Sequence, residues 1–124
     1  MGSANFPMAL DESNHRFFVA CRKPVALLVF DTDSRKVVAR VDSPGDANDL
    51  WYDAAWKRLY ISGGEGFIGV IEQHDGDHYT ALAKVPSAAG ARTSLFSQDL
   101  LRLFLAVPLR DDQKAELRIY YVAP

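Results

Sequence analysis

Apolar and polar residues alternate along short runs of the chain, and clusters of Gly, Pro, Asp, Asn and Ser separate these runs. Alternation with a period of two is typical of β-strands, and the separating clusters are typical of turns. No run has the 3.6-residue period of an amphipathic helix. The pattern therefore predicts an all-β chain with eleven strands, at residues 6–10, 16–20, 26–30, 36–41, 50–52, 58–62, 67–72, 79–85, 93–96, 103–107 and 116–122.

The chain also contains an internal repeat. The segments MALDESNHRFFVAC (8–21), LWYDAAWKRLYISG (50–63) and SLFSQDLLRLFLAV (94–107) align, and they share the arginines Arg16, Arg58 and Arg102. The steps are 42 residues (16 to 58) and 44 residues (58 to 102), and a strand-filled period in the low forties is that of one β-propeller blade. The repeat predicts a partial propeller of about three blades, at residues 5–43, 46–86 and 91–124, with four, four and three antiparallel strands.

Three stretches resemble a known family. VFDTDSRKVVARV (29–41), which a Pro-Gly turn follows, resembles the repeat of the YVTN-type bacterial β-propellers, and so do RLYISGGEGFIGVIE (58–72) and ARTSLFSQDLLRLFLAVP (91–108). This family is similar in architecture to the NHL and WD40 propellers, but the chain lacks the Gly-His and Trp-Asp pairs of WD40 repeats. The resemblance covers residues 5–124 and implies the C-terminal part of a propeller with about seven blades. It implies a fold and leaves the function open, because propellers serve many unrelated roles.

An arc of three blades leaves two apolar sheet faces and one edge strand, at residues 117–122, without neighbours. Exposed apolar faces and open strand edges both favour association. Two copies supply about six blades, which lies within the range that closes a ring. We therefore expect a homodimer in which two chains close head to tail. The alternative is an open arc that dimerises by face-to-face packing of its sheets.

Charge and composition exclude several partners. The chain has 14 basic and 16 acidic residues and a net charge of −2, which argues against nucleic acid and anionic membranes as partners. The longest apolar stretch, residues 25–30, is too short to span a membrane. No basic segment followed by an apolar run lies near the start, so no signal peptide is expected in this chain, and a periplasmic or secreted parent protein stays open. The single cysteine, Cys21, is interpreted as a small buried hydrophobe.

Candidate binding residues lie in the loops of one propeller rim. Propeller ligands usually bind where the loops between second and third strands meet the loops that lead into the next blade. The predicted strands place the loops 21–25, 43–49, 63–66, 86–92 and 108–115 at this rim. The candidates in these loops are Arg22, Lys23, Asp46, Asn48, Asp49, Glu65, Arg92 and Arg110. Their mixed charge predicts a small polar ligand or a peptide, and the alternative is that they are ordinary solvated loop charges.

Two further motifs are interpreted as turns. Gly63-Gly64-Glu65-Gly66 lies between two predicted strands and lacks the Gly-Lys-Ser/Thr of a phosphate loop, so a tight turn with positive φ accounts for its glycines. The histidines of Gln73-His74-Asp75-Gly76-Asp77-His78 suggest a metal cluster, but Asp-Gly is a strong hairpin signal. We therefore expect neither a metal site nor a cofactor.

Three hypotheses about function follow. The favoured hypothesis is a non-enzymatic binding or scaffold module that associates with itself into a closed ring. The first alternative is a fragment of a metal-dependent lactonase- or hydrolase-like propeller, for which Glu65, Asn48 and Asp49 are the available channel ligands. The second alternative is a remnant that assembles but binds no ligand.

Overall fold

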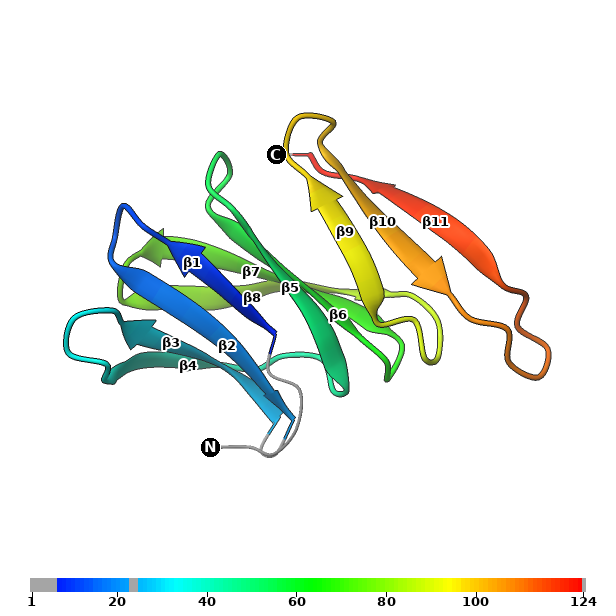
Figure 1. Ribbon diagram of the computed structural model, residues 1–124, viewed down its shortest axis with the longest axis horizontal. Coiled ribbons are helices and arrows are strands. Elements are labelled where there is room, and N and C mark those ends of the chain that lie inside the picture. The colour runs from blue at the N-terminus through cyan, green and yellow to red at the C-terminus, as the bar shows by residue number, and fades with distance from the viewer. Residues whose placement is uncertain (1–6, 23–24, 124) are drawn as a thin grey trace.

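The computed structural model describes residues 7–22 and 25–123, which form eleven strands in three antiparallel sheets (Figure 1). Blade 1 contains β1 (Met8–Asp11), β2 (Arg16–Arg22), β3 (Val25–Asp31) and β4 (Val37–Val41). Blade 2 contains β5 (Ala47–Asp53), β6 (Arg58–Gly63), β7 (Phe67–Asp75) and β8 (His78–Pro86). Blade 3 contains β9 (Thr93–Ser97), β10 (Arg102–Val107) and β11 (Glu116–Tyr121).

The strands of each blade follow chain order, so each sheet is a simple antiparallel meander. Successive blades touch through their first strands, because β1 contacts β5 and β5 contacts β9. Figure 1 shows the three sheets following one another from the blue blade 1 to the orange and red blade 3. The prediction of an all-β, partial propeller with four, four and three strands is confirmed. The described ranges contain no helix that is long and apolar enough to cross a membrane.

Blade 2 is the central layer, and its strand β6 is buried on both faces. Along β6, Leu59 and Ile61 pack toward blade 1, whereas Tyr60 packs toward blade 3. Because successive side chains of a strand point to opposite faces, a strand between two neighbours needs apolar residues at every position. This explains why the sequence around Tyr60 is continuously apolar rather than alternating.

Two apolar cores hold the blades together. The core between blades 1 and 2 is formed by Phe18, Ala20, Leu27, Val29, Ala47, Leu50, Leu59, Ile61 and Ile71. The core between blades 2 and 3 is formed by Tyr60, Ile68, Ala91, Leu103, Leu105 and Val107. Burial of each large apolar side chain contributes about 1.5–3 kcal/mol. The junctions between blades are therefore the main source of stability in this fold.

The other face of blade 1 carries a small cluster of its own. Val19, Cys21 and Phe30 are buried there, and Phe17 and Leu28 pack against them. The rings of Phe17 and Phe30 are stacked with their centroids 4.7 Å apart. Cys21 is a buried free thiol in this cluster, as the sequence predicts.

Candidate functional site

The loops of the predicted rim are joined to one another by hydrogen bonds. The backbone N–H of Gly64 donates to the carbonyl of Asp46 over 2.9 Å, and the N–H of Gly90 donates to the carbonyl of Gly64 over 2.7 Å. The side-chain amide of Gln113 donates to the carbonyl of Ala89 over 2.9 Å. The loops that follow β4, β6, β8 and β10 are therefore connected in sequence along one edge of the molecule.

Asp46 is the centre of charge in this rim. Its Oδ1 lies 3.1 Å from Nη2 of Arg22, at the end of β2, and its Oδ2 lies 2.9 Å from Nη1 of Arg92, just before β9. Arg22 also donates through Nε to the carbonyl of Ala47 over 3.2 Å. All three side chains are partly exposed, so solvent screening limits each ion pair to about 0–1 kcal/mol. One carboxylate between two guanidinium groups leaves the cluster with a net positive charge.

Asn48 and Asp49 are not in a loop, which corrects the prediction for residues 43–49. The strand β5 begins at Ala47, so both residues belong to it. The carboxylate of Asp49 accepts a hydrogen bond from the backbone N–H of Ser94 over 2.8 Å. Asp49 thus ties blade 2 to the first strand of blade 3. A turn signal at Pro44-Gly45 marks the loop but does not tell where the next ladder begins.

The remaining candidates lie at the edges of the rim. Glu65 lies 3.7 Å from the ammonium of Lys84, and Arg110 pairs with Gln113 in an isolated β-bridge. Lys23 is outside the described residues. Within the described ranges, no three His, Cys, Asp or Glu side chains gather into a group that could hold a metal ion. Within one chain, the described side chains of Glu65 and Asp49 belong to no such group.

The glycines of the Gly63–Gly66 turn are required for two different reasons. Gly66 has φ of 113°, which is the positive value that the sequence predicts. Gly63 and Gly64 do not, so the prediction is wrong for them. A Cβ on Gly63 would lie 2.6 Å from the carbonyl oxygen of Gly45, and one on Gly64 would lie 2.1 Å from Oδ2 of Asp46. These two glycines instead let the β4–β5 loop approach the end of β6.

Two buried carboxylates lie at equivalent places of the repeat, and the sequence analysis did not single them out. Asp11 in blade 1 and Asp53 in blade 2 each end the first strand of a blade. Asp11 accepts hydrogen bonds of 2.8 Å from the side-chain amides of Asn14 and Gln73, and the latter comes from blade 2. The signal that could have found them is their shared position in the aligned segments.

The surroundings of these carboxylates shift the pKa values of nearby groups. Burial acts to raise the pKa of Asp11, but hydrogen bonds from Asn14, Gln73 and Ser13 outweigh burial and hold this pKa below its ordinary value. Burial raises the pKa of Tyr60, and its hydrogen bond of 2.7 Å to Asp53 raises it further. The carboxylate of Asp11 thus stays ionised and the phenol of Tyr60 stays protonated at neutral pH. With its oxygens occupied by donors, Asp53 connects blades rather than acting on a ligand.

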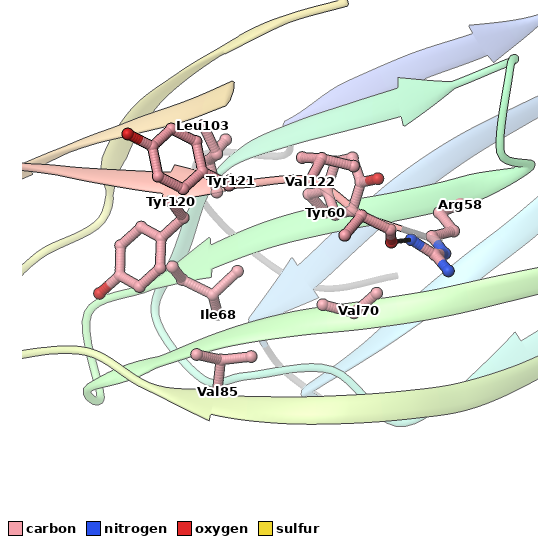
Figure 2. Close-up of a pocket in the computed structure, with 10 residues that line it drawn as sticks. Arg58, Tyr60, Ile68, Val70, Val85, Leu103, Tyr120, Tyr121 and Val122 are labelled. Atoms are coloured by element: carbon pink, nitrogen blue, oxygen red, sulfur yellow. Dashed lines mark hydrogen bonds between the residues drawn. The ribbon is translucent and has the colours of Figure 1, made fainter. Parts of the chain in front are cut away.

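An apolar hollow lies between blades 2 and 3, beside β11. Figure 2 shows side chains from both blades pointing into it, among them Ile68, Val70 and Val85 from blade 2 and Tyr120 and Val122 from blade 3. Its volume is about 330 Å³. The sequence analysis missed this hollow, because it depends on how the two sheets face each other.

Comparisons with known proteins support the fold. A scan against protein-family models finds no match, and a search of the curated proteins finds none. Among solved structures, the chain is similar to the hydrazine synthase of Kuenenia stuttgartiensis, with a TM-score of 0.69 and 12% identity over 86% of this chain. This chain spans 30% of the length of that protein chain. At this identity, the likeness shows the fold alone.

Proposed function

We propose that the chain is a non-enzymatic binding and scaffold module, and that two copies associate head to tail into a closed ring of about six blades. The observation that supports the ring is the open face of blade 3, which repeats the covered face of blade 2. The equivalent residues on β6 and β10 are Arg58 and Arg102, Tyr60 and Phe104, and Ser62 and Ala106. This proposal keeps the YVTN-type bacterial repeat as the family that the chain resembles.

The strand β11 also resembles its counterpart in blade 2, β7, on the open face of blade 3. Leu117 and Ile119 pair with the open-face residues of β10 in the way that Ile68 and Val70 pair with β6. Ile68 is buried by blade 3, whereas Ile119 is 50% exposed and Leu117 is 63% exposed. An apolar strip of this kind on a sheet face is typical of a surface that another sheet covers.

The repeated arginines also favour a following blade. Arg16 reaches from blade 1 into blade 2, where it donates to the carbonyl of Gly76 over 2.9 Å and pairs with Asp77 over 2.7 Å. Arg58 reaches from blade 2 to the carbonyl of Ala123, just beyond β11. In the described part of the chain no blade follows β11, and Arg102 donates within its own blade, to the carbonyl of Leu100 over 2.7 Å.

Blade 1 offers the complementary surface. Met8 and Leu10 lie on its outer face and are 60% and 51% exposed. The residues at the same places in blade 2, Leu50 and Tyr52, pack against blade 1. A second copy that docks blade 1 on blade 3 therefore reproduces the contact that already exists between blades of one chain. Because this contact joins two different faces, it closes a ring only when the rotation between the copies allows it.

Size-exclusion chromatography with light scattering tests the ring. We expect a mass of twice 13.8 kDa for the unmodified chain. Ile119→Lys and Leu10→Lys each place a charge in the proposed contact, so both variants should elute as monomers. Leu82→Lys is the matched control, because Leu82 is 48% exposed on the outer strand of blade 2, and its mass should not change.

Two results would contradict the ring. The first is a monomeric mass for the unmodified chain. A dimer that Ile119→Lys breaks and Leu10→Lys leaves intact would show face-to-face packing of two copies of blade 3.

The same proteins test the rim as a binding site. In the closed ring, the Arg22, Asp46 and Arg92 clusters of both copies line one mouth of the channel, where their net positive charge favours a small polar ligand or an acidic peptide. Inorganic phosphate and citrate are suitable first probes. A ligand of the ring should raise the Tm of the dimer and leave that of Ile119→Lys unchanged. A ring that responds to no polar ligand would instead match the assembly-only alternative.

A further inference from the structure

The outer edge of blade 3 differs from the outer edges of the other blades. Blades 1 and 2 each have a fourth strand, β4 and β8, paired with the third. In the described residues, the last strand of blade 3 is β11, which pairs with β10 on one side only. Along its other side the backbone N–H and C=O groups of β11 are free of a ladder partner among the described strands. Such an edge is a template for another strand.

The hollow beside β11 lies where a fourth strand would place its side chains. At the junction of blades 1 and 2, β8 fills the equivalent place: Tyr79 packs edge-on against Phe18, with the ring centroids 5.7 Å apart. Tyr79 is opposite Gln73 in the ladder, and Ala81 is opposite Ile71. At the junction of blades 2 and 3, the residue at the place of Phe18 is Tyr60, and it lines the hollow of about 330 Å³.

The lining of the hollow shows which chemistry it would accept. Ile68, Val70 and Val85 form one wall, and Tyr120 and Val122 form the other (Figure 2). The described lining has one charged residue, Arg58, which is held by the carbonyl of Ala123. The side chains in the wall from blade 2 are already partly buried. A side chain that enters the hollow therefore displaces few polar groups. The hollow thus fits apolar and aromatic side chains, not charged ones.

We propose that β11 and this hollow bind an extended segment of a partner polypeptide, which adds as a fourth strand antiparallel to β11. The segment carries an aromatic residue opposite Val122 and a small apolar residue two positions later, opposite Tyr120. Backbone hydrogen bonds to β11 hold the segment, and the alternate side chains that enter the hollow select it. The proposal does not depend on the ring, because the ring uses the face of blade 3 and the segment uses its edge.

The chain itself supplies the probe. A synthetic nine-residue peptide with the β8 sequence, HYTALAKVP, has the aromatic and small residues at the required spacing. Isothermal titration calorimetry should show binding of one peptide per chain, and hydrogen exchange should show slowed exchange in β11 when the peptide is bound. The same peptide with Tyr79→Ala should bind at least about tenfold more weakly, because the aromatic side chain fills the hollow.

Variants of the protein locate the site. Val122→Lys and Val85→Lys each place a charge in the hollow from a different blade, and each should reduce peptide binding by at least about tenfold. Leu82→Lys should bind the peptide as the unmodified chain does. Ile119→Lys should also bind the peptide, since Ile119 lies on the other face of β11. This outcome would show that peptide binding in the hollow does not require the dimeric ring. The two substitutions in the hollow come from separate blades, so the misfolding of one variant leaves the other as a test.

Three results would overturn the proposal. The first is no calorimetric binding of the peptide at millimolar concentration. The second is binding that Val122→Lys and Val85→Lys both leave unchanged, or that leaves exchange in β11 unchanged. The third is slow hydrogen exchange in β11 without peptide, in a dimer that Val122→Lys dissociates. A second copy of the chain would then occupy the hollow.

Discussion

Asp53 connects blades 2 and 3 through a buried carboxylate, and its replacement by asparagine tests this role. One oxygen accepts the backbone N–H groups of Ala55 and Trp56, over 3.1 and 3.2 Å, and the side-chain amide of Gln98 over 3.1 Å. The other oxygen accepts the hydroxyl of Tyr60 over 2.7 Å. Asp53→Asn keeps the shape of the side chain and removes the charge and one acceptor.

The cost follows from this geometry. The amide oxygen of asparagine can still accept the two turn N–H groups, but its NH₂ group cannot accept the hydroxyl of Tyr60. A hydrogen bond to a charged group contributes about 1.5–3 kcal/mol, and the three remaining bonds lose their charge assistance. We expect a loss of about 2–3 kcal/mol in the free energy of unfolding. For a chain of this size, that corresponds to a fall of about 10 °C in Tm.

Urea unfolding followed by tryptophan fluorescence measures this loss, because Trp51 and Trp56 both lie near the site. Tyr60→Phe and the double variant complete a cycle, in which the two changes should be coupled by about 1–2 kcal/mol. Ser97→Ala is the matched control, since Ser97 has the same place in blade 3 but is only half-buried and accepts an exposed hydrogen bond from the backbone N–H of Leu100. It should change stability by less than about 0.5 kcal/mol. A loss below about 0.5 kcal/mol for Asp53→Asn, or strictly additive changes in the cycle, would refute the reasoning.

Two further predictions concern stability. The folded pKa of Asp11 lies below its ordinary value of 3.8, so its contribution is present above about pH 4 and is lost as the pH falls through the folded pKa; Asp11→Asn should flatten the acid limb of a stability-against-pH curve, and an unchanged limb would contradict this. Gly63→Ala should lower the free energy of unfolding by about 1–3 kcal/mol, because its Cβ would lie 2.6 Å from the carbonyl oxygen of Gly45. Gly76→Ala, whose nearest neighbour is 3.4 Å away, should cost less than about 1 kcal/mol, and equal costs in urea unfolding would refute the steric argument.

The order of strands was readable from the sequence, because the period of two and the turn residues are local signals. The alternation along residues 36–41 marks a half-exposed outer strand, and the Asp-Gly pair at Asp75-Gly76 marks a hairpin. The repeat added the grouping into blades, since Arg16 and Arg58 recur at one blade's length. Strand ends were less accurate: β5 begins at Ala47, three residues before the predicted strand.

The contacts between blades were decided by the tertiary structure. The sequence placed Arg22, Asp46 and Arg92 on one rim, but the sharing of one carboxylate by two guanidinium groups depends on how the end of β2 meets two loops. Asp11 and Asp53 look like ordinary turn acids in the sequence, and only packing shows that donors from the next blade satisfy them. Local signals fix the path of a strand, whereas Gln73 lies 62 residues from Asp11 and Gln98 lies 45 residues from Asp53.

The hollow beside β11 also depends on the tertiary structure. From the sequence, the repeat predicted blades of four, four and three strands with an edge strand at residues 117–122. The sequence by itself therefore determined the strands and their grouping into blades. Only the tertiary structure decided that Val70 and Tyr120 leave an apolar space there, because the size of a gap between two sheets depends on their twist and spacing and not on the residues of either sheet alone.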